Sequence, residues 1–257
     1  MSIKNIKIGI VIPFRDQEAN NKRTAELNEF VEYMESYLAG YDYKIFVIEQ
    51  TNDGRKFNRG QLLNIGFDLA RKENFDTFIF HDVDLLPTEE LKYFYVNAPT
   101  DSPVHICPAG ERLSGSNHPR YGFGDSFEFF GGICAFNQQM FEQINGFPND
   151  FWGWGGEDEE LLRRTKLFYK VVRPQEGTVR DLENLTYDQK FNLLRTNNSY
   201  CDDWNCWQQN TDFLNKQIEN QHINGLNQII NADIKKINHI TEKNYTIYTV
   251  ELRDFNL

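Results

Sequence analysis

Two groups of carboxylates in the sequence have residue types and a spacing that suit catalysis or metal binding. The first is the D-x-D triplet Asp82-Val83-Asp84, at the end of the apolar run 76–84. On a strand, residues i and i+2 point to the same face, so both carboxylates are expected to project together. They repel one another unless a cation or a proton lies between them. Mg²⁺ or Mn²⁺ with a diphosphate would satisfy the triplet, and a solvated strand end or a helix-capping aspartate explains a bare D-x-D equally well.

The second group is the segment "FWGWGGEDEE", residues 151–160, in which four consecutive carboxylates follow three glycines and two tryptophans. Glu157 and Asp158 are expected in the first turn of a helix, where free N–H groups and the helix dipole favour anions. The glycines before them predict a loop that moves over a ligand and excludes water with an indole ring. A tryptophan-anchored turn is the structural alternative.

The triplet Phe57-Asn58-Arg59 precedes a predicted helix. An aromatic ring, an amide and a guanidinium at such a junction can stack on a base and bind phosphate. Taken alone, the triplet favours the simpler interpretation of a helix start with a surface arginine.

The elements that must position these residues follow from the apolar periodicity. Residues 6–14, 43–50 and 76–84 are β-branched runs typical of buried strands, with helical apolar faces at 27–38 and 62–70 between them. This βαβαβ order predicts an α/β fold with a mostly parallel, Rossmann-like central sheet, and ligands at the carboxyl ends of its strands. Further along, the patterns predict strands at 103–110, 129–137, 169–174 and 245–252. They predict helices at 138–144, near 187–196 and near 204–220. Another helix is expected to begin at Glu157, with Leu161, Leu162 and Phe168 facing inward.

Composition excludes several classes of protein. The 257 residues have a formal net charge of -11, so no basic face for nucleic acid is expected. The start of the chain has too few apolar residues for a signal peptide or a transmembrane segment, which predicts a cytoplasmic location. The four cysteines fit no standard zinc spacing and are expected to be reduced thiols.

Taken in order, "VIPFRD", "FNRGQLLNIGF", "FIFHDVDLLP", "FFGGICAF" and "NGFPNDFWGWGGEDEE" resemble the β-1,4-galactosyltransferase family, glycosyltransferase family 7. The forms "HDVDLLP" and "TVRDLE" are most similar to the xylosylprotein galactosyltransferase branch. The resemblance runs from about residue 8 to 183. It implies a single GT-A domain over 1–257, with a nucleotide-binding half at 1–90 and an acceptor-binding half at 91–257. It also implies a UDP-sugar donor, Mn²⁺ or Mg²⁺, a carbohydrate acceptor, and inversion at the anomeric carbon.

The resemblance also implies a role for each matching residue. Asp158 would be the general base, with Glu157 and Glu159 orienting sugar hydroxyls, and Asp84 would ligate the metal. Trp154, Asp158 and Glu159 would meet the acceptor. The residues implied to bind the donor nucleotide-sugar are Pro13, Phe14, Arg15, Phe57, Arg59, Asp82, Val83, Trp154, Gly155 and Gly156.

The sequence departs from the family pattern at three places. The family completes its metal site with histidines in an arrangement like R-H-x-H, where this chain reads "GTVRDLEN", so we expect Asp181 and Glu183 to coordinate the metal with Asp84. Gln17 replaces an arginine that many members have, and Phe129 replaces a tyrosine. UDP-galactose is the first choice of donor, a β-1,4 linkage is expected, and UDP-GalNAc or UDP-GlcNAc remain alternatives.

A non-catalytic carbohydrate-binding protein is a further alternative, motivated by the missing histidines. Relatives are commonly anchored in a secretory organelle. A Golgi-type enzyme that has been trimmed of its stem is therefore an alternative to the cytoplasmic location.

Overall fold

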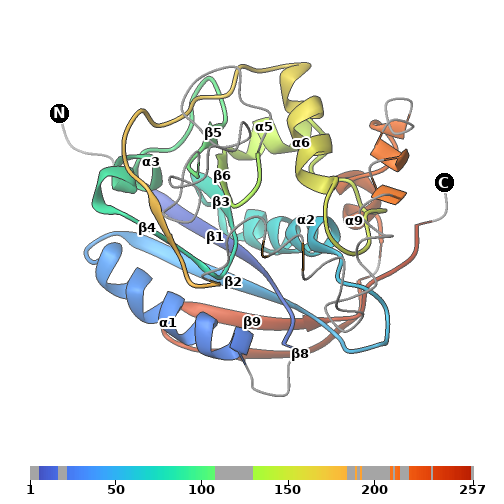
Figure 1. Ribbon diagram of the computed structural model, residues 1–257, viewed down its shortest axis with the longest axis horizontal. Coiled ribbons are helices and arrows are strands. Elements are labelled where there is room, and N and C mark those ends of the chain that lie inside the picture. Colours follow the sequence, from blue (N-terminus) through green and yellow to red (C-terminus); the bar gives the residue numbers. More distant parts are fainter. Residues whose placement is uncertain are drawn as a thin grey trace.

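The computed structural model describes residues 6–16, 22–107, 130–183, 189, 192, 209–210, 212–214, 220–232 and 234–255. Within these ranges, seven strands form one mixed sheet in the order β5-β6-β3-β1-β2-β9-β8. Its parallel part consists of β1 (Lys7–Phe14), β2 (Asp42–Gln50), β3 (Thr77–His81) and β9 (Tyr245–Val250). Figure 1 shows these strands crossing the centre of the molecule, with β9 and β8 (Lys236–Thr241) along one side.

The predicted βαβαβ unit is confirmed. Helix α1 (Lys22–Tyr37) connects β1 to β2, and α2 (Arg59–Ala70), followed by the turn η1 (Arg71–Glu73), connects β2 to β3. Both strand pairs are parallel, with Ile10 of β1 lying between Ile45 and Ile79. The strands β5 (Val104–His105), β6 (Ile133–Phe136) and β8 are antiparallel to their neighbours. The sheet is therefore mostly parallel, as predicted.

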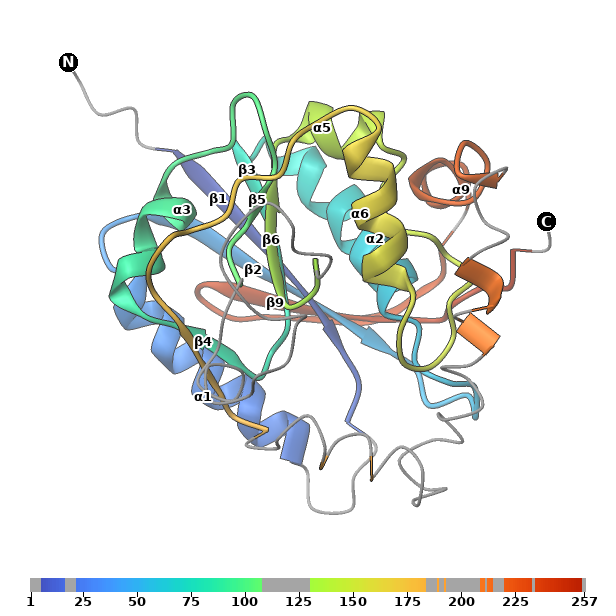
Figure 2. The same cartoon turned by 45° about the horizontal axis from the view of Figure 1, so that its top comes forward.

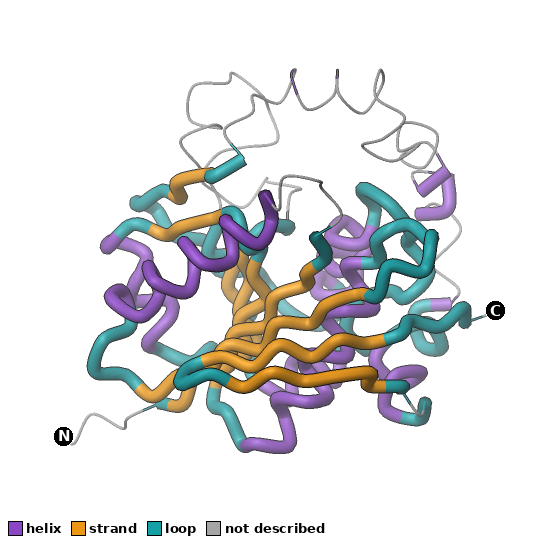
Figure 3. The backbone as a smooth tube through the Cα atoms, turned by 90° about the horizontal axis from the view of Figure 1, so that it is seen from below, coloured by secondary structure: helices purple, strands orange, loops and turns teal. Residues whose placement is uncertain are grey.

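The sheet is buried on both faces, because alternate side chains of its strands enter two apolar clusters. Ile8, Ile10 and Ile12 of β1 pack with Phe30 and Met34 of α1. Val11, on the opposite face, packs in the cluster that includes Leu62, Phe67 and the phenylalanines of β3. Helices lie on both sides of the sheet (Figure 3), and Figure 2 shows α2 and α6 (Glu157–Lys166) side by side on one of them.

The remaining described elements surround this frame. The strands β4 (Leu85–Pro87) and β7 (Val179–Asp181) form a small antiparallel sheet in which Leu85 pairs with Asp181. Further short helices are η2 (Glu89–Leu91), α3 (Lys92–Val96), α5 (Gln138–Gln143) and α9 (Leu226–Ile230). The described ranges contain no helix with both the length and the apolar character that a bilayer crossing requires.

Three local predictions were wrong. The strand predicted at 76–84 ends at His81, and Asp82 begins a turn closed by the Leu85 N–H donating to the Asp82 carbonyl at 3.4 Å. The strand predicted at 169–174 is only an isolated bridge between Val172 and Val104. Phe168 lies beyond the end of α6 and is 51% exposed, because the helix stops before its side chain could face inward.

Other predictions lie partly or wholly outside the described ranges. The helices near 187–196 and 204–220 are described only at scattered positions, which include helical residues 209–210 and 212–214. Gln17, Phe129, Cys201 and Cys206 are outside the described residues, and Cys107 and Cys134 are buried.

Candidate active site

The carboxyl ends of the parallel strands bring several predicted donor-binding residues to one edge of the sheet. β1 ends with Pro13 and Phe14 and is followed by Arg15, while the loop after β2 leads to Phe57. The Arg15 guanidinium lies 5.4 Å from the centre of the Phe57 ring and donates to the Arg55 carbonyl oxygen at 2.8 Å. An aromatic ring and a cation are thus adjacent where nucleotides bind in parallel α/β sheets.

Asn58 fixes the start of α2 and thereby the position of Arg59. Its side chain caps the helix by accepting from the Gln61 N–H at 2.9 Å, and its amide donates to the Asn149 carbonyl at 2.7 Å. Its own N–H donates to Oε1 of Gln50 at 3.0 Å. The loop 51–58 is therefore held at both ends, and Arg59 projects from the first turn of a firmly capped helix.

Arg59 joins the D-x-D turn to the glutamate at the start of α6. Its Nε and Nη2 both lie 2.8 Å from Oδ1 of Asp82, and its Nη1 lies 3.5 Å from Oε1 of Glu157. The favoured interpretation of a surface arginine was therefore wrong, since only 13% of the Arg59 side chain is exposed.

Glu157 and Asp158 occupy the first turn of α6, as predicted. Burial, with the neighbouring charge of Asp158, raises the pKa of Glu157 well above its usual value, and Arg59 opposes part of this rise. Among the described side chains, Glu157 has a buried Oε2 with no hydrogen-bond partner. When it is protonated, Glu157 can donate a hydrogen bond to a ligand hydroxyl. Asp158 lies partly exposed beside it, and its Oδ1 accepts from the Glu159 N–H at 2.9 Å.

The glycine-rich loop, residues 152–156, connects the "NGFPND" turn to α6. Gly153, Gly155 and Gly156 have φ angles of 82°, 94° and 95°, which side-chain-bearing residues rarely adopt. A Cβ atom on Gly156 would lie 2.4 Å from the Phe151 ring. Backbone conformation and close packing explain these glycines, and Trp154 lies half-buried between them.

Asp84, Asp181 and Glu183 come together through the small β4–β7 sheet. One oxygen from each carboxylate lies within 4.8 Å of the others. The Leu182 N–H donates to the Asp84 carbonyl at 2.7 Å, which extends the ladder and sets the register of the three residues. Three oxygen ligands from carboxylates suit Mn²⁺ or Mg²⁺, so this donor set fits the expected ion, and metal binding itself stays a prediction.

Arg23 of α1, a residue that the sequence analysis did not select, balances this cluster. Its guanidinium lies 2.9 Å from Asp84, 3.7 Å from Glu183 and 2.8 Å from Glu26. Because α1 begins immediately before Arg23, the cation reaches the carboxyl edge from the helix that covers this face of the sheet.

The two carboxylates of the D-x-D therefore do not share one face, contrary to the prediction. The chain turns after His81, so Asp82 contacts Arg59 while Asp84 joins the second cluster. Val83, between the two aspartates, and Phe14 are both buried in the apolar cluster that includes α1. Val83 could therefore contact a donor only through its main chain, and Phe14 only through its main chain or the edge of its ring. Since Asp82 and Asp84 are only two residues apart, their Cα atoms are at most about 7 Å apart.

His81 packs in the core of the protein. It is fully buried, its ring meets Phe30 edge-on at 4.8 Å, and its Nε2 lies 2.7 Å from the Tyr95 hydroxyl. Burial lowers its pKa to about 4, so the imidazole is neutral at neutral pH.

A network of buried asparagines supports the site and was missed. Asn149 accepts from Asn64 at 2.9 Å, donates to the Gly225 carbonyl at 2.7 Å, and its N–H donates to Oδ1 of Asn224 at 2.8 Å. Asn224 in turn donates to Asp150 at 2.9 Å. Amide contacts follow no periodic pattern, so the sequence does not predict such a network. Its one signal was a weak resemblance of "NGLNQI", residues 224–229, to the family pattern.

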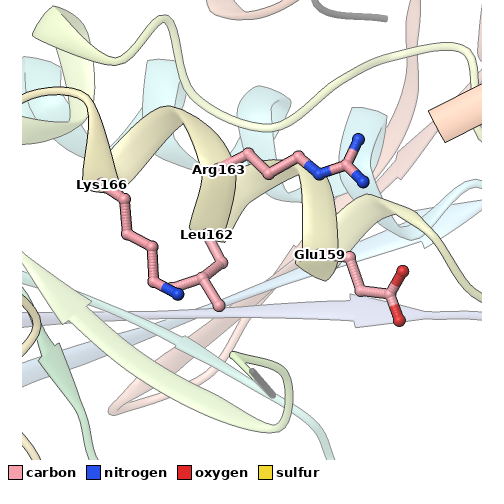
Figure 4. Close-up of a pocket in the computed structure, with 4 residues that line it drawn as sticks. All are labelled: Glu159, Leu162, Arg163 and Lys166. Atoms are coloured by element: carbon pink, nitrogen blue, oxygen red, sulfur yellow. The ribbon is translucent and has the colours of Figure 1, made fainter. Parts of the chain in front are cut away.

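A pocket of about 240 Å³ lies along α6, lined among the described residues by Glu159, Leu162, Arg163 and Lys166 (Figure 4). These positions share one side of the helix, since residues three and four apart are neighbours on its surface.

Comparison with protein-family models identifies two matches. Residues 2–97 match the N-terminal region of glycosyl transferase group 7, and residues 114–185 match the N-terminal domain of galactosyltransferase. Among curated proteins, β-1,4-galactosyltransferase 7 of Drosophila melanogaster is 39% identical over 173 residues, covering 66% of this chain and 48% of that protein. β-1,4-Galactosyltransferase 4 of Rattus norvegicus is 36% identical over 173 residues, covering 66% of this chain and 45% of that protein. The chain therefore spans about half the length of these curated relatives.

Two solved structures agree with the model over most of the chain. The catalytic domain of Drosophila β-1,4-galactosyltransferase 7 in complex with xylobiose has a TM-score of 0.69 and 28% identity, covering 97% of this chain and 95% of that one. A mutant of the same enzyme, in complex with manganese, UDP-Gal and xylobiose, has a TM-score of 0.70 and 27% identity over the same shares. The GT-A type fold is thereby confirmed.

Proposed function

The chain belongs to the β-1,4-galactosyltransferase family, glycosyltransferase family 7, and on this premise we propose that it is an inverting, metal-dependent galactosyltransferase. It moves galactose from UDP-galactose to a sugar hydroxyl of a carbohydrate acceptor, with a β-1,4 linkage expected. The main support is Arg59, which contacts Asp82 of the D-x-D and Glu157 beside the candidate base. This contact joins the nucleotide edge of the sheet and the start of α6 in one site.

The donor binds, on this proposal, across the carboxyl edge of the sheet. Phe57 and Arg15 face the nucleotide, with Pro13, Phe14 and Val83 shaping the floor, and Arg59 keeps Asp82 in place. Residues 1–90 supply most of this half of the site, and residues 91–257 supply the acceptor half.

Asp84, Asp181 and Glu183 would hold Mn²⁺, or Mg²⁺. An ion bound there supplies positive charge to the diphosphate as it departs. The chain contributes the three carboxylates and the β4–β7 ladder that fixes their register.

Asp158 acts as the general base. It takes the proton of the acceptor hydroxyl while the bond from that oxygen to the anomeric carbon forms and the bond from the anomeric carbon to the diphosphate oxygen breaks. Glu157 is poorly suited to this role, because burial raises its pKa and Arg59 already contacts its Oε1. Its unpartnered Oε2 instead orients a sugar hydroxyl.

Trp154, Gly155 and Gly156 cover the donor sugar, and Glu159 with the pocket along α6 receives the acceptor. The galactose donor is favoured by the complex of the Drosophila neighbour with UDP-Gal, and its xylobiose makes β-linked xylosides the first acceptors to test. UDP-GalNAc and UDP-GlcNAc are the alternatives that the same assay decides.

The test is UDP release across a panel of UDP-sugars, with Mn²⁺ and xylobiose, for wild type, Asp158→Asn and the exposed control Asp101→Asn. We expect UDP-galactose to be turned over fastest. The kcat should fall about 10²–10⁴-fold in Asp158→Asn and should not fall in the control Asp101→Asn. Transfer that survives Asp158→Asn would reject the proposed base, and the absence of transfer from every donor would favour a carbohydrate-binding protein.

The metal ligands are tested separately by Mn²⁺ titration, followed by electron paramagnetic resonance. Asp181→Ala and Glu183→Ala should weaken Mn²⁺ binding, whereas the exposed Glu89→Ala should not. Unchanged binding and metal-dependent turnover in both variants would show that Asp181 and Glu183 are not ligands.

A further inference from the structure

We propose that Asn210 is a positioning residue that fixes the main chain of the glycine-rich loop and thereby orients its N–H groups toward the donor. The inference rests on the proposed function for its consequence in catalysis. Its structural basis is independent of that function, and no motif in the sequence suggested it.

The first observation is that one amide group collects three carbonyl oxygens of this loop. Nδ2 of Asn210 lies 2.9 Å from the Gly155 oxygen, 3.3 Å from the Trp152 oxygen and 3.4 Å from the Trp154 oxygen. Asn210 itself is only 6% exposed, so water competes little for its amide group.

The short helical segment that contains Asn210 is itself attached to the site at two further points. Phe213 meets the Phe151 ring at 5.2 Å, and Nη1 of Arg163 donates to the Leu214 carbonyl at 2.7 Å. In Figures 1 and 2 the orange helical pieces, residues 209–210 and 212–214, lie next to the loop that leads into α6. Asn210 therefore extends from an element that is held on both sides of the loop.

Fixing the carbonyls also fixes the N–H groups. In a trans peptide the C=O and the following N–H point in opposite directions. The N–H of Gly153, which shares a peptide group with the Trp152 carbonyl, follows this rule, since it donates to the Phe57 carbonyl at 2.8 Å. By the same geometry the N–H groups of Gly155 and Gly156 point away from Asn210.

The loop needs such a clamp because its own residues restrict it little. Gly153, Gly155 and Gly156 can adopt many backbone conformations, and ordering glycine costs more entropy than ordering any other residue. Only a donor can bind carbonyl oxygens, so the amide of Asn210 cannot be replaced by a carboxylate of the same size.

The test compares Asn210→Asp and Asn210→Ala with Asn231→Asp. Asn231 is an exposed residue whose amide also donates to one main-chain carbonyl, that of Asn227, at 2.8 Å, so its variant controls for the added charge. Two readouts are needed: hydrogen–deuterium exchange of the peptide that covers residues 152–157, and steady-state kinetics with UDP-galactose beside the Kd of UDP with Mn²⁺.

We expect faster exchange in residues 152–157 for both Asn210 variants and no change in β1 or β2. The kcat/KM for UDP-galactose should fall at least about tenfold, because the hydrogen bonds to these three carbonyls are lost, while the Kd of UDP stays within about twofold. A residue that only supports overall stability would not separate these two quantities in a folded variant.

Unchanged exchange and kinetics in either folded Asn210 variant would overturn the proposal. Asn210→Ala removes the donor without adding charge, so it decides the matter if Asn210→Asp does not fold. Failure of both variants to fold would also overturn it, because Asn210 would then support the whole structure rather than the loop. If wild type shows no transfer at all, the proposed function is rejected, and the exchange measurement still decides the role of Asn210.

Discussion

Replacing Arg59 by glutamine should destabilise the protein far more than the same change at a surface arginine. Arg59 is 13% exposed and lies between Asp82 at 2.8 Å and Glu157 at 3.5 Å. Removing one partner of a buried ion pair costs about 3–5 kcal/mol, because the remaining charges lose their compensation. Since Asp82 is 33% exposed, we take the lower end, about 3 kcal/mol.

This loss is measurable by differential scanning calorimetry. For a domain of this size, about 3 kcal/mol corresponds to a decrease in Tm of roughly 6–12 °C. The matched control is Arg180→Gln, because Arg180 contacts Glu29 at 2.7 Å with both side chains about half exposed (52% and 49%). Such a pair contributes less than about 1 kcal/mol.

The pH dependence gives an independent check on the same variant. Glu157 has a raised pKa in the folded state, so its ionised form destabilises the fold increasingly as the pH rises above the unfolded value. Without Arg59 this effect grows, and the difference in Tm between Arg59→Gln and wild type should be larger at pH 8 than at pH 5. Equal decreases in Tm for Arg59→Gln and Arg180→Gln, or a difference that does not depend on pH, would refute the assignment of Arg59 as the compensating charge.

Three further outcomes follow from single residues. Burial raises the pKa of Asp150 to about 6, so the protein loses stability from this group as the pH rises from 4 to 6. Asp150→Asn should therefore raise the free energy of unfolding at pH 8 by about 1 kcal/mol, after allowance for partial exposure, and so raise Tm by a few degrees in calorimetry. The same variant should show no gain in Tm at pH 4. In Gly156→Ala, the new Cβ atom would sit at a φ of 95° and lie 2.4 Å from the Phe151 ring, so the free energy of unfolding in urea should fall by about 1–3 kcal/mol. An unchanged urea midpoint would contradict this backbone geometry. Burial lowers the pKa of His81 to about 4, so the neutral imidazole stabilises the fold by about 3 kcal/mol, and this stability is lost as the pH falls from 6.5 to 4. His81→Gln should flatten the curve of unfolding free energy against pH in that range. An unaltered slope would contradict the lowered pKa.

The sequence predicted the frame of the fold well, because burial on both faces of a sheet produces a strong local signal. Continuous β-branched runs such as residues 6–14 correspond closely to strands like β1. The Asp82–Asp84 turn was mistaken for strand because a triplet of polar and apolar residues is locally compatible with both. Only the pairing of β4 with β7, whose partners Leu85 and Asp181 are far apart in sequence, shows where that strand must end.

The candidate site was predictable where its residues lie in recognisable motifs, and not elsewhere. Asp181 and Glu183 were proposed as ligands from their position in a family pattern, and the structure brings them to Asp84. Arg23 and Asn210 were missed, because a cation on a helix or an amide in an asparagine-rich segment has no local signature. What selects them is a contact made after the chain has folded.

The placement of β9 has a consequence for biosynthesis. This strand inserts between β2 and the edge strand β8, with Ile45 opposite Tyr245, so contacts across some two hundred residues of sequence complete this side of the sheet. Such distant pairings form slowly, and until the ribosome has released the last strand, one side of β2 stays open to other chains. A nascent chain halted before residue 245 should therefore depend on chaperones and aggregate without them.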